Sequence, residues 1–230
     1  MTTQPRRYDR ATASRSLSRV ARVAVLSIAL GFAVQGVVLA LILWGGGEAR
    51  AAVAQGAGGV AWAALVCTGV AVGTVVARGR PILAGLVAAA LAPTSLAVAK
   101  ASQKVMSGWL GAAQTEAVLS LGAVSLIRAV EYGVLGWLLG SIAAAGRERA
   151  EPYLASGAAV GLLFGGAVTV LTFNAAAVAG TPLTDAKLAA TVVNEVLFPL
   201  GCAFVIFLGQ QVGRSLDLIE DKGDGPQLAA

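Results

Sequence analysis

Long apolar stretches separated by short polar or glycine-rich segments make up most of this sequence. A helix needs about 20 mostly apolar residues to cross a bilayer. Stretches of about that length lie at residues 22–44, 57–77, 81–99, 117–141, 153–179 and 187–209. The pattern predicts an all-α polytopic membrane protein with six transmembrane helices.

The segments between these stretches carry residues that end or begin helices. Gly45-Gly46-Gly47 follows the first stretch, and glycine does not favour continuation of a helix. Thr184 and Asp185 precede the sixth stretch and are candidate N-cap residues. Residues 100–116 are too short and too mixed to span a bilayer, so we predict an interfacial amphipathic helix or a loop there.

Basic residues are distributed unevenly about the predicted spans. With the N-terminus in the cytoplasm, 12 of the 17 lysines and arginines fall in cytoplasmic segments. The outer segments hold four, which are Arg50, Lys100, Lys104 and Lys187, and Arg128 lies within a span. Because cytoplasmic loops are enriched in Lys and Arg, we expect both termini to be cytoplasmic, which requires an even number of spans.

This topology divides the chain into a basic cytoplasmic tail at residues 1–21, a transmembrane domain at 22–209 and a cytoplasmic C-terminal tail at 210–230. The N-terminal arginines are expected to contact anionic lipid headgroups. Since the basic residues flank apolar spans, the net charge of +5 does not point to nucleic acid as a partner. The bilayer is the predicted partner, with a membrane protein or a second copy of the chain as further candidates.

The composition removes several kinds of chemistry. The chain has no histidine and two cysteines, Cys67 and Cys202, which both lie in apolar stretches. Catalysis by histidine, haem ligation by histidine and Cys-X-X-Cys metal or redox sites are therefore excluded. We predict no metal, no cofactor and no enzymatic activity.

The two halves of the chain share weak features of an inverted duplication, with repeats at residues 22–106 and 117–209. Pro93 in the third span and Pro199 in the sixth each stand four residues before an alanine. A proline inside a helix frees a carbonyl group and kinks the helix. Kinked helices at matching places of two halves are typical of transporters with a site near the midplane. Chance similarity in a chain rich in Ala, Val and Gly is the alternative.

Ionisable residues inside the spans are the main functional signal, because a charge in hydrocarbon costs about 2.5–3.5 kcal/mol on insertion scales. Arg128 and Glu131 lie near the middle of the fourth span, and their spacing of three places them on one helical face. Asn194 and Glu195 lie at a similar depth in the sixth span. We therefore predict an ion pair between Arg128 and Glu195.

Two amides, Gln35 in the first span and Asn174 in the fifth, fall in the same outer half of the bilayer. Together with the charged residues they predict a polar cluster around a narrow site. The alternative is a buried network that fixes the register of the helices and binds nothing. Intramembrane polar groups hold bundles together in this way, at about 0.6–2 kcal/mol each.

Glycine recurs at every fourth position along the fifth span, at Gly157, Gly161 and Gly165. Small residues at this spacing let two helices approach each other closely. We therefore predict a tightly packed helix face along this stretch.

These features favour a small integral membrane transporter or channel. Its polar site would lie between the fourth and sixth spans, in the outer half of the bilayer, and the arginine would suit a small anionic solute. The alternative is a non-catalytic membrane subunit or assembly factor of a larger complex, such as a substrate-binding subunit of a multi-component transporter. Frequent Ala, Gly, Val and Arg favour the cytoplasmic (inner) membrane of a bacterium.

Overall fold

The computed structural model describes residues 5–76, 80–113, 119–181 and 183–223, of which 5–16 and 213–223 are described as helical backbone alone. These residues form helices and no strand. The elements are α1 (Pro5–Trp44), α2 (Ala49–Val76), α3 (Pro81–Leu110), α4 (Leu121–Ala144), α5 (Ala150–Val160), the π-helix η1 (Gly161–Gly165), α6 (Gly166–Val178) and α7 (Asp185–Gly223).

Six apolar segments are long enough to cross a bilayer, which confirms the predicted number and the all-α class. They are Leu17–Trp44, Ala49–Val76, Pro81–Leu110, Leu121–Ala144, Ala150–Val178 and Asp185–Val212. The fifth combines α5, η1 and α6 into one rod. The chain is therefore built as a polytopic membrane protein.

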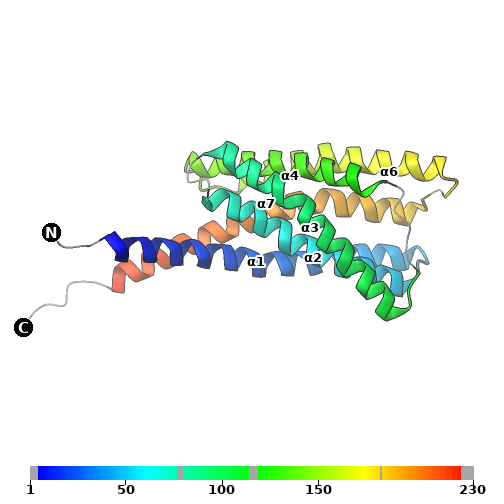
Figure 1. Cartoon of the computed structure of the whole chain (residues 1–230), viewed down its shortest axis with the longest axis horizontal. Helices are drawn as coiled ribbons and strands as arrows, with labels where there is room; N and C mark the ends of the chain where they lie inside the picture. Colours follow the sequence, from blue (N-terminus) through cyan, green and yellow to red (C-terminus); the bar gives the residue numbers. More distant parts are fainter. Residues whose placement is uncertain (1–4, 77–79, 114–118, 182, 224–230) are drawn as a thin grey trace, which may run out of the picture.

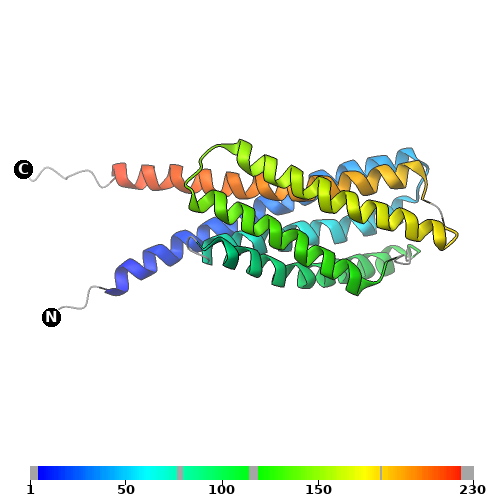
Figure 2. The same cartoon turned by 90° about the horizontal axis from the view of Figure 1, so that it is seen from above.

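Both ends of the chain leave the helical bundle on the same side. The start of α1 (blue) and the end of α7 (red) project beyond the other helices at one end of the molecule (Figure 1). The view turned by 90° shows the same arrangement (Figure 2). Residues 5–21 of the predicted basic tail and 210–223 of the C-terminal tail continue these two helices, whereas 1–4 and 224–230 lie outside the described residues.

The third helix differs from the prediction. Residues 100–110 form neither a separate interfacial helix nor a loop, because α3 continues through them without a break. Residues 114–116 of this predicted segment and 117–118 of the predicted fourth span lie outside the described residues. Lysine and glutamine are good helix formers, and a lysine near a helix end can reach the interface with its ammonium group. The helix ends where Gly111 adopts a left-handed conformation, at φ 60°.

Turn chemistry at two predicted positions is confirmed. Gly46, in the glycine run after α1, has φ of 74°, which is strained for residues other than glycine. The Thr184 hydroxyl accepts a hydrogen bond of 3.3 Å from the Lys187 amide at the start of α7, as an N-cap does.

The helices are packed in chain order around the bundle. Each contacts the next one along the sequence, and α7 closes the ring against α1 on one side and α5 on the other. Three helices, α2, α4 and α7, also contact one another across the centre. The centre is therefore made by the second, fourth and sixth spans.

The predicted inverted duplication is not shown by this arrangement. Exchanging two halves of three spans would carry the second, fourth and sixth spans onto the fifth, first and third. Among the described residues, the first, third and fifth spans do not contact one another across the centre to a similar extent. The two predicted kink residues, Pro93 and Pro199, lie inside the continuous helices α3 and α7.

Candidate functional site

The ion pair predicted between Arg128 and Glu195 is present, and Glu131 joins it. Arg128 Nη1 donates to Glu131 Oε2 at 2.5 Å, and Arg128 Nη2 donates to Glu195 Oε2. The side chains of Arg128, Glu131 and Glu195 are 10%, 0% and 9% exposed. One guanidinium therefore binds two carboxyl groups, one from its own helix and one from α7.

The cluster lies toward the end of the bundle opposite to the chain termini. Counting 1.5 Å per residue, Arg128 is roughly 10 Å from the first residue of α4 and Glu195 roughly 15 Å from the first residue of α7. Both helices start at that opposite end. The cluster is thus inside the apolar length of the helices and off centre along the bundle axis.

Two amides extend the cluster to α1. Gln35 Nε2 donates to Asn194 Oδ1 at 2.8 Å, and Asn194 Nδ2 donates to Glu195 Oε1 at 3.5 Å. Gln35 lies directly over Gly59 of α2, where any side chain would overlap the amide. The absence of a side chain at Gly59 therefore makes room for the bond between α1 and α7.

Aromatic side chains of α2 and α4 close the cluster on another side. The Arg128 guanidinium carbon lies 5.6 Å from the centre of the Trp62 ring, within the range of a cation–π interaction. Trp62 in turn meets Tyr132 edge to face, with ring centres 5.3 Å apart. The sequence did not single out Trp62, because it lies near the outer end of the predicted span 57–77, where tryptophan is common. The helix α2 begins earlier, at Ala49, and this places Trp62 in its middle.

A second basic residue lies near the cluster. Lys100 of α3 is exposed and lies within electrostatic range of Glu195 of α7, and its ammonium donates to Gln103 Oε1 at 3.3 Å. Lys100 therefore adds positive charge on the Glu195 side of the cluster.

Three polar atoms in this region are buried and have no hydrogen-bond partner among the described residues. They are Glu131 Oε1, Gln35 Oε1 and the Tyr132 hydroxyl. A buried polar group without a partner costs about 1–3 kcal/mol. Arg128 therefore links the members of the cluster, and the three unpartnered atoms can still form hydrogen bonds, for example with a small polar group.

Asn174 is the predicted site residue that the structure does not bring to the cluster. It lies on α6 and is exposed. The other five predicted residues, Arg128, Glu131, Asn194, Glu195 and Gln35, are linked by the contacts above.

The glycine face predicted on the fifth span packs against α7 next to the cluster. A Cβ added at Gly165 would lie 2.8 Å from the Glu195 carbonyl oxygen, and one at Gly161 would lie 2.7 Å from the Val196 carbonyl oxygen. The Glu195 carbonyl has no helical donor, because Pro199 four residues later has no N–H. The Cα–H groups of these glycines therefore lie against carbonyl oxygens of α7, and one of these oxygens lacks its helical hydrogen bond because of Pro199.

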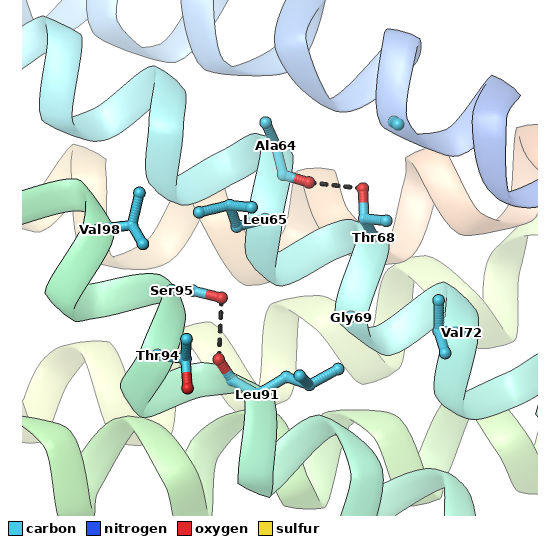
Figure 3. Close-up of a pocket in the computed structure, with 10 residues that line it drawn as sticks. Ala64, Leu65, Thr68, Gly69, Val72, Leu91, Thr94, Ser95 and Val98 are labelled. Carbon is cyan, nitrogen blue, oxygen red and sulfur yellow. Dashed lines mark hydrogen bonds between the residues drawn. The ribbon is translucent and has the colours of Figure 1, made fainter. Parts of the chain in front are cut away.

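Two grooves on the outside of the bundle are apolar and separate from the cluster. One of about 460 Å³ is formed mainly by α2 and α3, and in Figure 3 the Ser95 and Thr68 hydroxyls bond back to carbonyls of their own helices. The other, of about 480 Å³, lies between α3 and α4 beside Trp137. Neither groove is lined by a residue of the polar cluster.

Comparison of the chain with models of known families, with curated proteins and with solved structures finds no match. The class of the protein therefore rests on its own six apolar helices and on the charged cluster between them.

Proposed function

We propose that this protein is a small membrane transporter or channel whose polar site is the Arg128 cluster between α4 and α7. The observation that carries the proposal is the burial of one guanidinium and two carboxyl groups where α2, α4 and α7 meet. Charges inside a membrane bundle are expensive and are typical of solute or ion pathways. In this proposal the protein resides in a bacterial inner membrane with both termini cytoplasmic, and it has no catalytic step.

The bonding of Arg128 restricts how a solute could bind. Each of its terminal nitrogens donates to a carboxyl group, so a small anion would compete with Glu131 and Glu195 for the guanidinium. Lys100 on α3 supplies a second positive charge on the Glu195 side, where it would attract an anion that approaches from the end opposite to the termini. The proposed solute is therefore a small anion that replaces a carboxyl group on Arg128.

Reconstitution of the purified chain into liposomes tests this function. Light scattering would follow swelling in potassium chloride, nitrate or phosphate, with valinomycin to move potassium and, in a second set, a protonophore as well to return any protons that enter with the anion. Urea would serve as a neutral probe. We expect swelling in at least one anion above that of protein-free liposomes, and its loss in Glu195→Gln. Asn174→Ala, which alters an exposed amide outside the cluster, is the matched control and should swell like the natural chain.

The second candidate function is a non-catalytic subunit of a membrane complex. It is favoured by the low exposure of the charged side chains, which bond to one another as a sealed structural network would. In that case no anion would cause swelling, Glu195→Gln would change stability alone, and the chain would copurify from its native membrane with one partner at fixed stoichiometry.

A further inference from the structure

The charge balance of the cluster is uneven. Among the buried groups, Arg128 brings one positive charge, whereas Glu131 and Glu195 bring two negative charges when both are ionised. Lys100 is exposed and is not part of this buried set. An uncompensated charge in a buried site carries a large desolvation penalty. Two carboxylates that share a buried site favour a state in which one of them is protonated. The cluster therefore needs one further positive species.

The two carboxyl groups are not equivalent. Glu195 uses both oxygens, since Oε2 accepts from Arg128 and Oε1 accepts from Asn194, and Lys100 adds attraction from α3. Glu131 is fully buried and has one bonded oxygen, Oε2, while its Oε1 has no partner among the described residues. Glu131 is thus the carboxyl group whose negative charge is compensated less.

The other titratable groups around Glu131 do not supply that compensation. On its own helix the neighbour is Tyr132, whose hydroxyl is also buried and has no partner. Cys202 of α7 and Cys67 of α2 are buried and lie within electrostatic range of this part of the cluster. A phenol and two thiols carry no positive charge in either protonation state, so they cannot compensate a carboxylate. A metal ion is not favoured either, because the described residues contain no group of three carboxylate or thiol ligands.

We propose that Glu131 holds an exchangeable proton and that the cluster is a proton-binding site. A proton on Glu131 leaves the pair of Arg128 and Glu195 electrically neutral. It also weakens the hold of Glu131 on Arg128 Nη1, because a neutral carboxylic acid is a poorer acceptor than a carboxylate. That nitrogen can then turn to an anion, so a proton and an anion would occupy the site together. This coupling role rests on the proposed function, whereas the proton site does not.

Infrared spectroscopy of the whole chain in lipid at pH 8 tests the proton site. A protonated carboxyl group has a carbonyl stretch that shifts in D₂O, and substitution of Glu131 distinguishes its band from those of the exposed loop carboxyl groups Glu48, Glu148, Glu151 and Asp185. We expect this band in the natural chain and in Asn174→Ala, its loss in Glu131→Gln and a change of its frequency in Glu131→Asp. Glu195→Gln should also weaken the band, because it leaves Arg128 and Glu131 as a balanced pair. Absence of the band from the natural chain, or its survival in Glu131→Gln, would overturn the proposal.

A pH-sensitive dye inside the proteoliposomes tests the coupling role separately. Proton uptake that accompanies the permeant anion and is lost in Glu131→Gln would support it. If the infrared band is present but no anion or proton moves, the transport function is overturned while the proton site on Glu131 stands.

Discussion

The Arg128 cluster and the glycine face beside it stabilise the same part of α7 by opposite means. In the cluster, the Glu195 side chain is held by a guanidinium and an amide. In the glycine face, the Glu195 backbone carbonyl lies against Gly165, where no side chain fits. The first contact depends on charges that compensate each other, and the second depends on the absence of atoms.

The difference predicts how each region fails. Removing one charge from the cluster leaves its partners unpaired in a site that excludes water, whereas removing all of the charges leaves an apolar site. The glycine face has no partner to lose, and it fails when a side chain is added. Loss of a single charge should therefore damage the cluster, and addition of a side chain should damage the glycine face.

The largest effect is expected for Arg128→Leu. It leaves Glu195 ionised and buried without its guanidinium, and loss of one partner of a buried pair destabilises a protein by about 3–5 kcal/mol. The double variant Arg128→Leu/Glu195→Gln should regain most of this loss, because Glu131 already carries a proton in our proposal. The midpoint of thermal unfolding in lipid or detergent measures both.

Lys187→Leu is the matched control for this prediction, since it removes a positive charge from an exposed position of α7. We expect a change of at most about 0.5 kcal/mol, as for surface substitutions in general. If the single and double Arg128 variants unfold at the same temperature, Arg128 does not compensate Glu195, and the comparison between the two regions is wrong.

The pairing of Arg128 with Glu195 could be predicted because it depends on quantities that a sequence contains. Span boundaries follow from hydropathy, depth follows from the rise per residue, and the spacing of Arg128 and Glu131 places them on one face. The partner of Gln35 could not be predicted in this way. Its bond to Asn194 depends on how α1 and α7 are rotated about their axes, which packing against Gly59 decides.

Asn174 shows that the depth of a residue in the bilayer does not fix the direction in which its side chain points around the helix axis. It stands nine residues after Gly165, which is about two and a half turns of an α-helix, so it points away from the face that packs on α7. The glycine spacing therefore held the information that separates Asn174 from the cluster. The length of α3 could not be predicted for another reason. Lys100 and Lys104 end the apolar stretch, but both residues favour helix, so α3 continues through them to Leu110.

A smaller effect is expected when the glycine face is filled. In Gly165→Ala the new Cβ would lie 2.8 Å from the Glu195 carbonyl oxygen and 3.0 Å from the Glu195 Cβ, so η1 and α7 must move apart. Overpacking of this kind costs about 1–3 kcal/mol. Gly166→Ala, one residue on, meets nothing within 4 Å and should be neutral or slightly stabilising, as alanine favours helix.

Thermal unfolding of these two variants would sharpen the comparison. A loss of stability that is confined to Gly165→Ala supports the close helix packing that a glycine at this position permits. Equal stability of the two variants would mean that η1 and α7 separate without penalty, and the close approach at Glu195 would then have no part in stability.

The smallest effect is expected for the amide bond between Gln35 and Asn194, which joins α1 to the cluster without a charge. A double-mutant cycle with Gln35→Ala and Asn194→Ala should give a coupling energy of about 0.6 kcal/mol and no more than about 1.7 kcal/mol, the range of hydrogen bonds inside membrane bundles. The same cycle with Asn174→Ala in place of Gln35→Ala should give no coupling, because Asn174 is exposed on α6 and distant sites are additive. A coupling as large for Asn174 as for Gln35 would show that the amides act through general loosening of the bundle and not through the bond to Asn194. A coupling confined to Gln35 would place α1 within the same polar network as Arg128, at an energy well below that of the charged pair.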